Sequence, residues 1–155
     1  MSISYKATPV LNVSKLFSIK AKHDDVFQTL GYSTKGVGGN LYRYDSGSSA
    51  TPDGGFTLPG IGGTLSFSGT TFNGDAGTGR FIAVDQSVYN IEWWGGVENG
   101  ESGTTDHTNI FKRMILHAQQ QYTQVAKFRI PRGYWHISDT LNFGTLRGFL
   151  FAGEG

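Results

Sequence analysis

The stretch IEWWGGVENGESGTTDHTNIF, residues 91–111, sets two adjacent tryptophans on a glycine pair and then runs through a polar loop into a helix start. Exposed indoles stack on the apolar faces of sugars, so Trp93 and Trp94 could form a platform for a ligand. Large aromatic side chains are more often buried, however, and fill the space between packed units. We therefore predict that the pair packs a junction, and a carbohydrate-binding module remains the alternative.

A single strongly helical segment follows, over residues 106–120. Four apolar side chains fall at the i, i+3, i+4 and i+7 positions of one face: Phe111, Met114, Ile115 and Ala118. Thr105 or Asp106 is suited to cap the first turn by accepting a backbone N–H bond. Beyond this helix we expect strands over residues 125–130 and 134–137, a turn between them, and a last apolar run that stops at Gly153.

Upstream of the tryptophans the chain reads as mainly β. VFQTLGY (26–32) and GNLYRYD (39–45) predict a hairpin, in which Leu41 and Arg43 face one side and Tyr42 and Tyr44 the other. Residues 46–79 are rich in glycine, which indicates loops, with short strands expected at 55–58 and 65–67. GRFIAVD (79–85) carries an apolar pair on each face, which predicts a strand buried on both sides.

Composition excludes several functional classes. The 155 residues include 13 basic and 12 acidic side chains, so no overall field favours nucleic acid or an anionic membrane. There is no cysteine for a disulfide or a thiolate metal site. No stretch approaches the ~18 apolar residues of a membrane span, so we expect neither membrane insertion nor export by a standard signal peptide.

The charge is uneven near the start of the chain. Residues 1–22 carry four lysines and no acid: Lys6, Lys15, Lys20 and Lys22. Such a run is either a solvated terminal arm or a docking strip for an acidic partner.

Several spaced motifs in this order resemble one family. Trp-Trp-Gly-Gly, a polar loop, Thr-Asp-His-Thr, an amphipathic helix and FRIPRGYWHISDTL (128–141) are similar to the start of the pectate-lyase-like right-handed β-helix of bacteriophage tailspikes and tail fibres. The resemblance covers residues 93–141, with a looser match to the small β domain that often precedes such helices. Asn99-Gly100 stands where the family usually has Asp-Gly, and His107 where a second aspartate is frequent.

The resemblance implies a specific organisation. Residues 1–91 would form a virion-anchoring β domain with glycine-rich loops and a basic arm. Residues 92–155 would form the neck, the capping helix and the first coil of a right-handed parallel β-helix. One coil cannot bury both its faces, and repeat architectures need about three stacked units, so we expect further contacts from more coils or from partner subunits.

A homotrimer also follows from the resemblance, and we expect several aromatic side chains to line its threefold interface: Tyr42, Tyr44, Phe56, Phe81 and Trp93. Trp94, Phe111, Met114 and Ile115 are expected to pack the neck. The tail-docking residues would be Lys6, Lys15, Phe17, Lys20 and Lys22, with a phage tail adaptor, nozzle or baseplate protein as the receiver. The protein would then be made in the host cytoplasm and reside in the virion tail.

No catalytic, cofactor or metal site is predicted on this segment. Glu98, Glu101, Asp106 and His107 match no spacing of metal ligands, and no carboxylate pair has the context of a glycosidase. No phosphate-binding loop and no nucleophile elbow occurs, and His117 and His136 read as packing or surface residues. The resemblance places any depolymerase chemistry, hydrolase or lyase, in downstream coils that act on host surface polysaccharide. A polysaccharide-degrading enzyme therefore remains an alternative.

Overall fold

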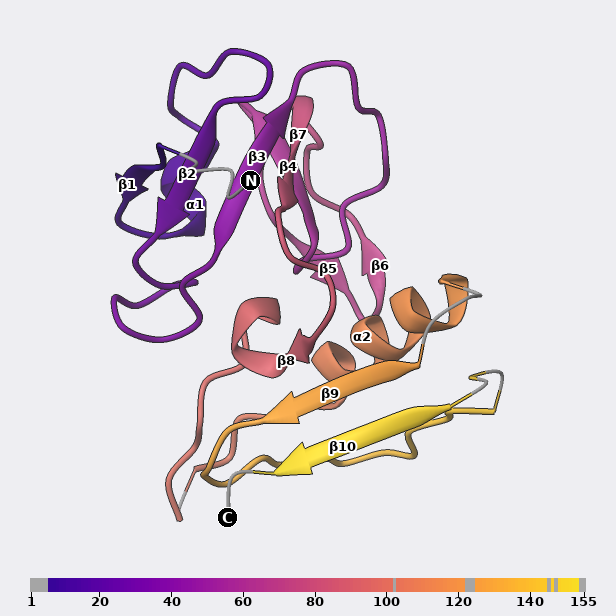
Figure 1. Cartoon of the computed structure of the whole chain (residues 1–155). Coiled ribbons are helices and arrows are strands. Elements are labelled where there is room, and N and C mark those ends of the chain that lie inside the picture. Colours follow the sequence, from indigo (N-terminus) through magenta and orange to yellow (C-terminus); the bar gives the residue numbers. More distant parts are fainter. Residues whose placement is uncertain (1–5, 102, 122–124, 145, 147, 154–155) are drawn as a thin grey trace, which may run out of the picture.

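The structure is a computed structural model that describes residues 6–101, 103–121, 125–144, 146 and 148–153. It is mainly β, and Figure 1 shows a larger sheet near the N-terminus and a smaller one near the C-terminus, with a long helix between the second sheet and the rest. Residues 1–5 of the predicted basic arm lie outside the described residues.

The larger sheet has five strands in the order β1-β2-β3-β7-β4. The strands are β1 (Thr8–Val10), β2 (Val26–Thr29), β3 (Leu41–Asp45), β4 (Thr57–Ile61) and β7 (Thr78–Ala83). β1 runs parallel to β2 and the other neighbours are antiparallel. The short helix α1 (Val13–Leu16) follows β1. The predicted hairpin of β2 and β3 is confirmed, with Tyr42 and Tyr44 buried and Leu41 and Arg43 only half-buried.

Three predictions about the glycine-rich part and β7 need correction. β4 begins at Thr57 rather than Gly55, because the Asp53 carboxylate accepts the Gly55 and Thr57 N–H groups and prolongs the turn. The hairpin of β5 (Phe67–Ser68) and β6 (Thr71–Phe72) likewise starts later than expected. In β7 Phe81 and Ala83 on one face are buried, whereas of the apolar pair predicted for the other face Ile82 is half-buried and Val84, beyond the strand, is 39% exposed, so that pair is only partly buried.

Arg80 ties the glycine-rich loops to β7. Its side chain is 6% exposed. It donates hydrogen bonds to the backbone carbonyls of Ala50, Ala76 and Gly79 over 2.5–3.1 Å. Buried backbone carbonyls need donors, and in loops a side chain has to supply them. One guanidinium thus orders two segments that have little regular structure of their own.

The smaller sheet is parallel throughout, in the order β10-β9-β8. Its strands are β8 (Tyr89–Asn90), β9 (Ala126–Ile130) and β10 (Phe149–Gly153), and the 3-10 helix η1 (Ile91–Trp94) and helix α2 (Thr108–Gln120) lie between β8 and β9 in the chain. Parallel neighbours need crossover connections, and here α2 belongs to the first of them. The helix predicted over 106–120 is present from Thr108 and the strand predicted over 125–130 from Ala126, and the last apolar run forms β10.

Residues 134–137 do not form the predicted strand. Only an isolated parallel bridge joins His136 to Asp106, where the His107 N–H donates to the His136 carbonyl. Nearby, the Glu98 carboxylate accepts the Tyr134 N–H over 3.1 Å. Tyr134 therefore bonds to the Glu98 side chain through its N–H, and its carbonyl accepts the Asn99 N–H over 3.1 Å.

A single hydrophobic core joins the two sheets. It includes rings from the larger sheet, such as Tyr42 and Phe81, and side chains of α2 and β9, such as Met114 and Phe128. The predicted boundary between residues 91 and 92 falls inside η1, whose Ile91 and Trp94 are both fully buried.

The aromatic side chains of the first sheet are buried within one chain. Tyr42, Phe56 and Phe81 are 0% exposed and Tyr44 is 3% exposed. The prediction that these four line a threefold interface was therefore wrong, because a single chain already encloses them. Trp93 remains half-buried against the same core.

The contact between Gly55 and Trp94 can be tested by adding a single methyl group. A Cβ at Gly55 would lie 2.2 Å from the Trp94 indole, so the ring or the loop must move. We expect Gly55→Ala to lower the free energy of unfolding by about 1–3 kcal/mol in a denaturant titration. Gly47→Ala is the matched control, since its Cβ would meet nothing closer than 3.7 Å. Equal stability of the two variants would contradict a tight contact.

Candidate functional site

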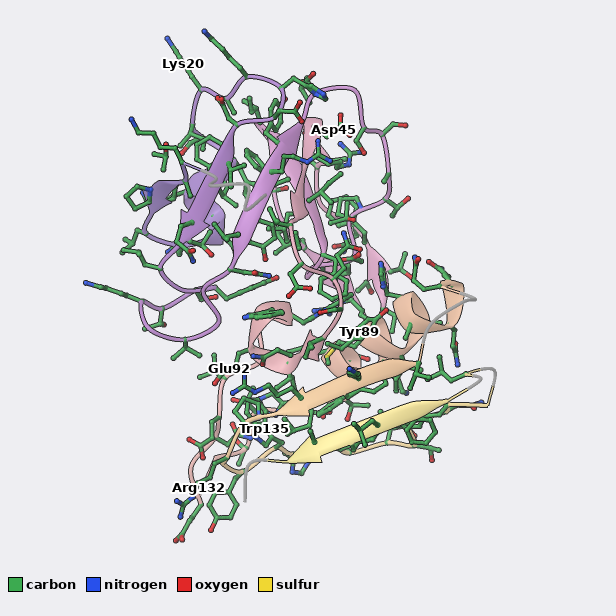
Figure 2. All side chains as sticks on the ribbon, in the orientation of Figure 1. Lys20, Asp45, Tyr89, Glu92, Arg132 and Trp135 are labelled. Atoms are coloured by element: carbon green, nitrogen blue, oxygen red, sulfur yellow. The ribbon has the colours of Figure 1, made fainter. Side chains whose placement is uncertain are left out.

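Trp94 lies at the centre of the junction between the two sheets. It is 0% exposed, and its ring centroid lies 5.3 Å from that of Phe56, 5.8 Å from His117 and 6.2 Å from Tyr89. Figure 2 shows Tyr89 in the same middle region of the molecule. Burial leaves Trp94 no face for a sugar, so the packing interpretation is confirmed for this residue.

Local backbone chemistry explains why Trp94 points inward. The Asn90 side chain accepts the Glu92 N–H over 3.1 Å and caps η1. Gly95 ends this helix with a φ of 92°, in the left-handed region that glycine adopts without steric cost. The glycine after the tryptophan pair therefore ends η1 directly after Trp94.

A polar network lies against this aromatic cluster. The Tyr89 hydroxyl is 3.0 Å from His117 Nδ1, and His117 Nε2 is 3.6 Å from Asp53 Oδ2. Asp53 Oδ1 accepts the N–H groups of Gly55 and Thr57 over 2.8 and 2.9 Å. Both imidazole nitrogens thus face protein groups. The series Tyr89–His117–Asp53 resembles a proton relay, but neither nitrogen of His117 is left to contact a substrate.

Burial controls the ionisation of this network. It raises the pKa of the Asp53 carboxyl, and the facing His117 only partly offsets this. It lowers the pKa of His117, against the opposite influence of Asp53. It also raises the pKa of Tyr89 to about 12, which keeps that hydroxyl neutral. The network is therefore largely buried and links the loop at 53–57 to α2.

A pocket of about 590 Å³ opens beside this polar network, between the loop at 50–57, the β5–β6 hairpin and α2. Arg113 and His117 of α2 and Asp53 of the loop supply its charged and ionisable groups. Arg113 packs over the Phe67 ring at 4.1 Å from its centroid. The sequence offered little signal for this pocket beyond the turn motif Pro52-Asp53-Gly54-Gly55.

The helix residues predicted to pack are buried in the core. Phe111, Met114 and Ile115 are at most 2% exposed. The helix begins at Thr108 rather than Asp106, and its N-cap is His107, whose side chain makes no capping bond, so neither Thr105 nor Asp106 is the N-cap. Asp106 Oδ1 accepts the Thr108 N–H over 2.9 Å from just outside the helix.

The predicted docking residues separate into two groups. Four lysines are exposed: Lys6, Lys15, Lys20 and Lys22. Phe17 is 8% exposed and belongs to the core, so its prediction as a surface docking residue was wrong. The segment from residue 8 onward is not a free arm, because β1 pairs with β2. Figure 2 shows Lys20 at the end of the molecule opposite to Arg132 and Trp135.

The last strand exposes an aromatic ladder. Phe149 and Phe151 are 49% and 44% exposed, and Phe151 stacks on its register partner Phe128 with centroids 5.3 Å apart. Phe143 stacks on Phe149 at 4.8 Å. Leu150 on the other face is 54% exposed. Both faces of β10 therefore present apolar side chains.

The acidic side chains of the polar loop hold the loop itself. Glu98 Oε1 accepts the N–H groups of Gly100 and Tyr134, and Glu101 Oε1 accepts the Tyr134 hydroxyl. Among the described residues, no group of three or more histidine, aspartate or glutamate side chains is arranged to hold a metal ion. In the same residues, no helix has the length and apolar character to cross a membrane.

Comparison with known proteins places the fold. No protein-family model matches the chain, and no curated sequence matches it. Its structure is similar to the tailspike protein gp49 of Acinetobacter baumannii bacteriophage Fri1, a capsular polysaccharide depolymerase. The TM-score is 0.62 and the identity 20%, over 95% of this chain and 21% of that one.

Two further structures show the same likeness. Full-length tailspike protein 2 from Escherichia coli O157:H7 bacteriophage CAB120 matches 81% of this chain and 14% of its own, with a TM-score of 0.52 and 11% identity. The enzymatically active domain of bacteriophage CBA120 tailspike protein 2 matches 76% and 18%, with a TM-score of 0.50 and 11% identity. These three structures are phage tailspike proteins or a part of one, and the chain spans 14–21% of their length.

The Asp53 and His117 interaction can be measured by NMR titration of the imidazole. The carboxylate favours the imidazolium form, so Asp53→Asn should lower the pKa of His117 below its already lowered value. Asp75→Asn is the control, because Asp75 is exposed and makes no recorded contact with His117. An unchanged or higher His117 pKa in Asp53→Asn would show that the two groups are not coupled.

Proposed function

We propose that this chain is the N-terminal part of a phage tailspike, which fastens a trimeric receptor-binding or depolymerase spike to the virion tail and so serves host adsorption. The proposal rests on one observation: 95% of this chain matches the structure of the Fri1 tailspike protein, and the match covers only 21% of that protein. Residues 1–91 would be the anchor, and residues 92–155 the neck, the capping helix and the first coil of a right-handed β-helix.

The smaller sheet supports the β-helix part of this proposal. Successive strands of a β-helix lie parallel, and like side chains of neighbouring coils stack in register. β8, β9 and β10 are parallel, and Phe128 stacks on Phe151 at the same register position. The exposed apolar faces of β10 suit burial by another coil, since isolated repeat units cannot cover their own cores.

The exposed lysines support the docking part. The larger sheet and its connections carry the four exposed lysines, Lys6, Lys15, Lys20 and Lys22. The exposed aromatic side chains of β10 belong to the smaller sheet. A spike needs its attachment and its receptor-binding part at different ends, and Figure 2 shows Lys20 far from Arg132. The receiver would be an acidic surface of a tail adaptor, nozzle or baseplate protein.

A second candidate function is polysaccharide cleavage, because the Fri1 protein of the same fold is a capsular polysaccharide depolymerase. Our proposal puts any such chemistry in coils beyond this segment. Incubation of residues 1–155 with host capsular polysaccharide should then release no oligosaccharide. Release by this segment alone would favour the enzyme over the anchor.

The trimer is tested by analytical ultracentrifugation of the chain. We expect a species of three times the 16.8 kDa chain mass, which dissociates on dilution, because threefold assembly would bury apolar side chains that one chain leaves exposed. A stable monomer at all concentrations would contradict the trimer.

Tail docking is tested by charge reversal in the full-length spike. Lys15→Glu/Lys20→Glu should reduce the retention of spikes on virions by about tenfold, since reversed charges oppose an acidic partner. Lys127→Glu/Arg132→Glu, at exposed positions of the other part of the chain, is the control with the same change in charge. Equal retention of both variants would contradict a lysine docking surface.

A further inference from the structure

The pocket beside α2 has the size and the chemistry of a ligand site. Its volume of about 590 Å³ lies within the roughly 300–1,000 Å³ range of small-molecule pockets. Three segments far apart in sequence form its walls: the loop at 50–57, the β5–β6 hairpin and the second half of α2. Figure 1 shows β5 and β6 beside α2.

Arg113 is the cation of this pocket and is poorly satisfied by the protein. Nη2 donates a long bond of 3.4 Å to the Trp94 carbonyl, and the buried Nε meets no acceptor within the part of the chain that the structure describes. None of the ion pairs recorded among the described residues involves Arg113. Its guanidinium packs over Phe67 at 4.1 Å. A guanidinium stacked on a ring retains edge N–H groups that suit a carboxylate.

Asp53 does not neutralise this cation directly. Its Oδ1 accepts two backbone N–H groups and its Oδ2 faces His117. The carboxyl is therefore directed at the loop and the imidazole, and it acts on Arg113 through its charge without a direct ion pair.

The rim of the pocket is rich in neutral hydrogen-bonding groups. Hydroxyl and amide side chains line it: Thr51, Thr57, Thr70, Thr71, Gln120 and Gln121. These groups both donate and accept, as a ligand with several hydroxyls requires. Phe72 and Leu116 add apolar surface, which suits the C–H face of a small ring.

From these contacts we infer that the pocket binds a small organic anion that carries several hydroxyl groups, the chemistry of a monomeric sugar acid. Arg113 pairs with the carboxylate, and the threonine and glutamine side chains bind the hydroxyls. The site uses neither the lysines nor β10, so it stands independently of the tailspike proposal.

Isothermal titration calorimetry of the 155-residue chain tests this inference with three probes: D-glucuronate, D-glucose and acetate. We expect D-glucuronate to bind. D-glucose lacks the carboxylate and acetate lacks the hydroxyls, so each should bind at least about tenfold more weakly, as expected for the loss of a charge-assisted hydrogen bond or of several neutral ones. Binding of glucose as tight as that of glucuronate would overturn the role of Arg113. Equal binding of acetate would overturn the role of the hydroxyls, and no binding of glucuronate would overturn the site.

Two variants locate the binding. Arg113→Gln should weaken glucuronate binding by about tenfold or more, while Lys112→Gln removes the same charge from the adjacent residue outside this pocket and should change nothing. Thr71→Val, at an exposed position of the hairpin, keeps the shape and removes one hydroxyl, so it tests the rim if Arg113→Gln fails to fold. Unchanged affinity in both pocket variants would place the ligand elsewhere.

Discussion

The packing of Trp94 against the backbone at Gly55 is the contact on which the rest of this structure depends. Trp94 comes from the turn before the polar loop, and Gly55 from the loop before β4, so the contact joins the larger sheet to the helix and the smaller sheet. Any side chain at 55 would occupy the space of the indole. The rings of Phe56, Tyr89 and His117 then close around it, and one core extends through both sheets.

Much of the regular structure could be predicted because it follows from periodicity. The alternation in residues 41–45 identified the buried tyrosines, and the spacing of Phe111, Met114 and Ile115 identified the helix. The misplaced elements share another cause. Asp53 accepts backbone N–H groups in the turn before β4, and Glu98 accepts the Tyr134 N–H in the segment predicted as a strand. Such bonds depend on where the chain passes in three dimensions, and a pattern of residue types does not contain that information.

Some residues of the candidate sites could likewise be predicted from their type and spacing, and others could not. Burial of Trp94 followed from the general behaviour of large aromatic residues, and the helix residues followed from their stripe. The pairing of Asp53 with His117 and the position of Arg113 over Phe67 could not be predicted, because these partners are distant in sequence and lie in segments without a periodic signal. Phe17 was misassigned because a lysine-rich neighbourhood suggested exposure, whereas the helix α1 turns this ring into the core.

The way Arg80 holds the glycine-rich loops has a consequence for the conditions that the protein tolerates. Its guanidinium is buried and bonds to backbone carbonyls rather than to a carboxylate. Mobile ions screen the attraction between exposed opposite charges, but they have little access to a buried bond between a cation and neutral dipoles. The loops around β7 are therefore held by an interaction that concentrated salt leaves largely intact.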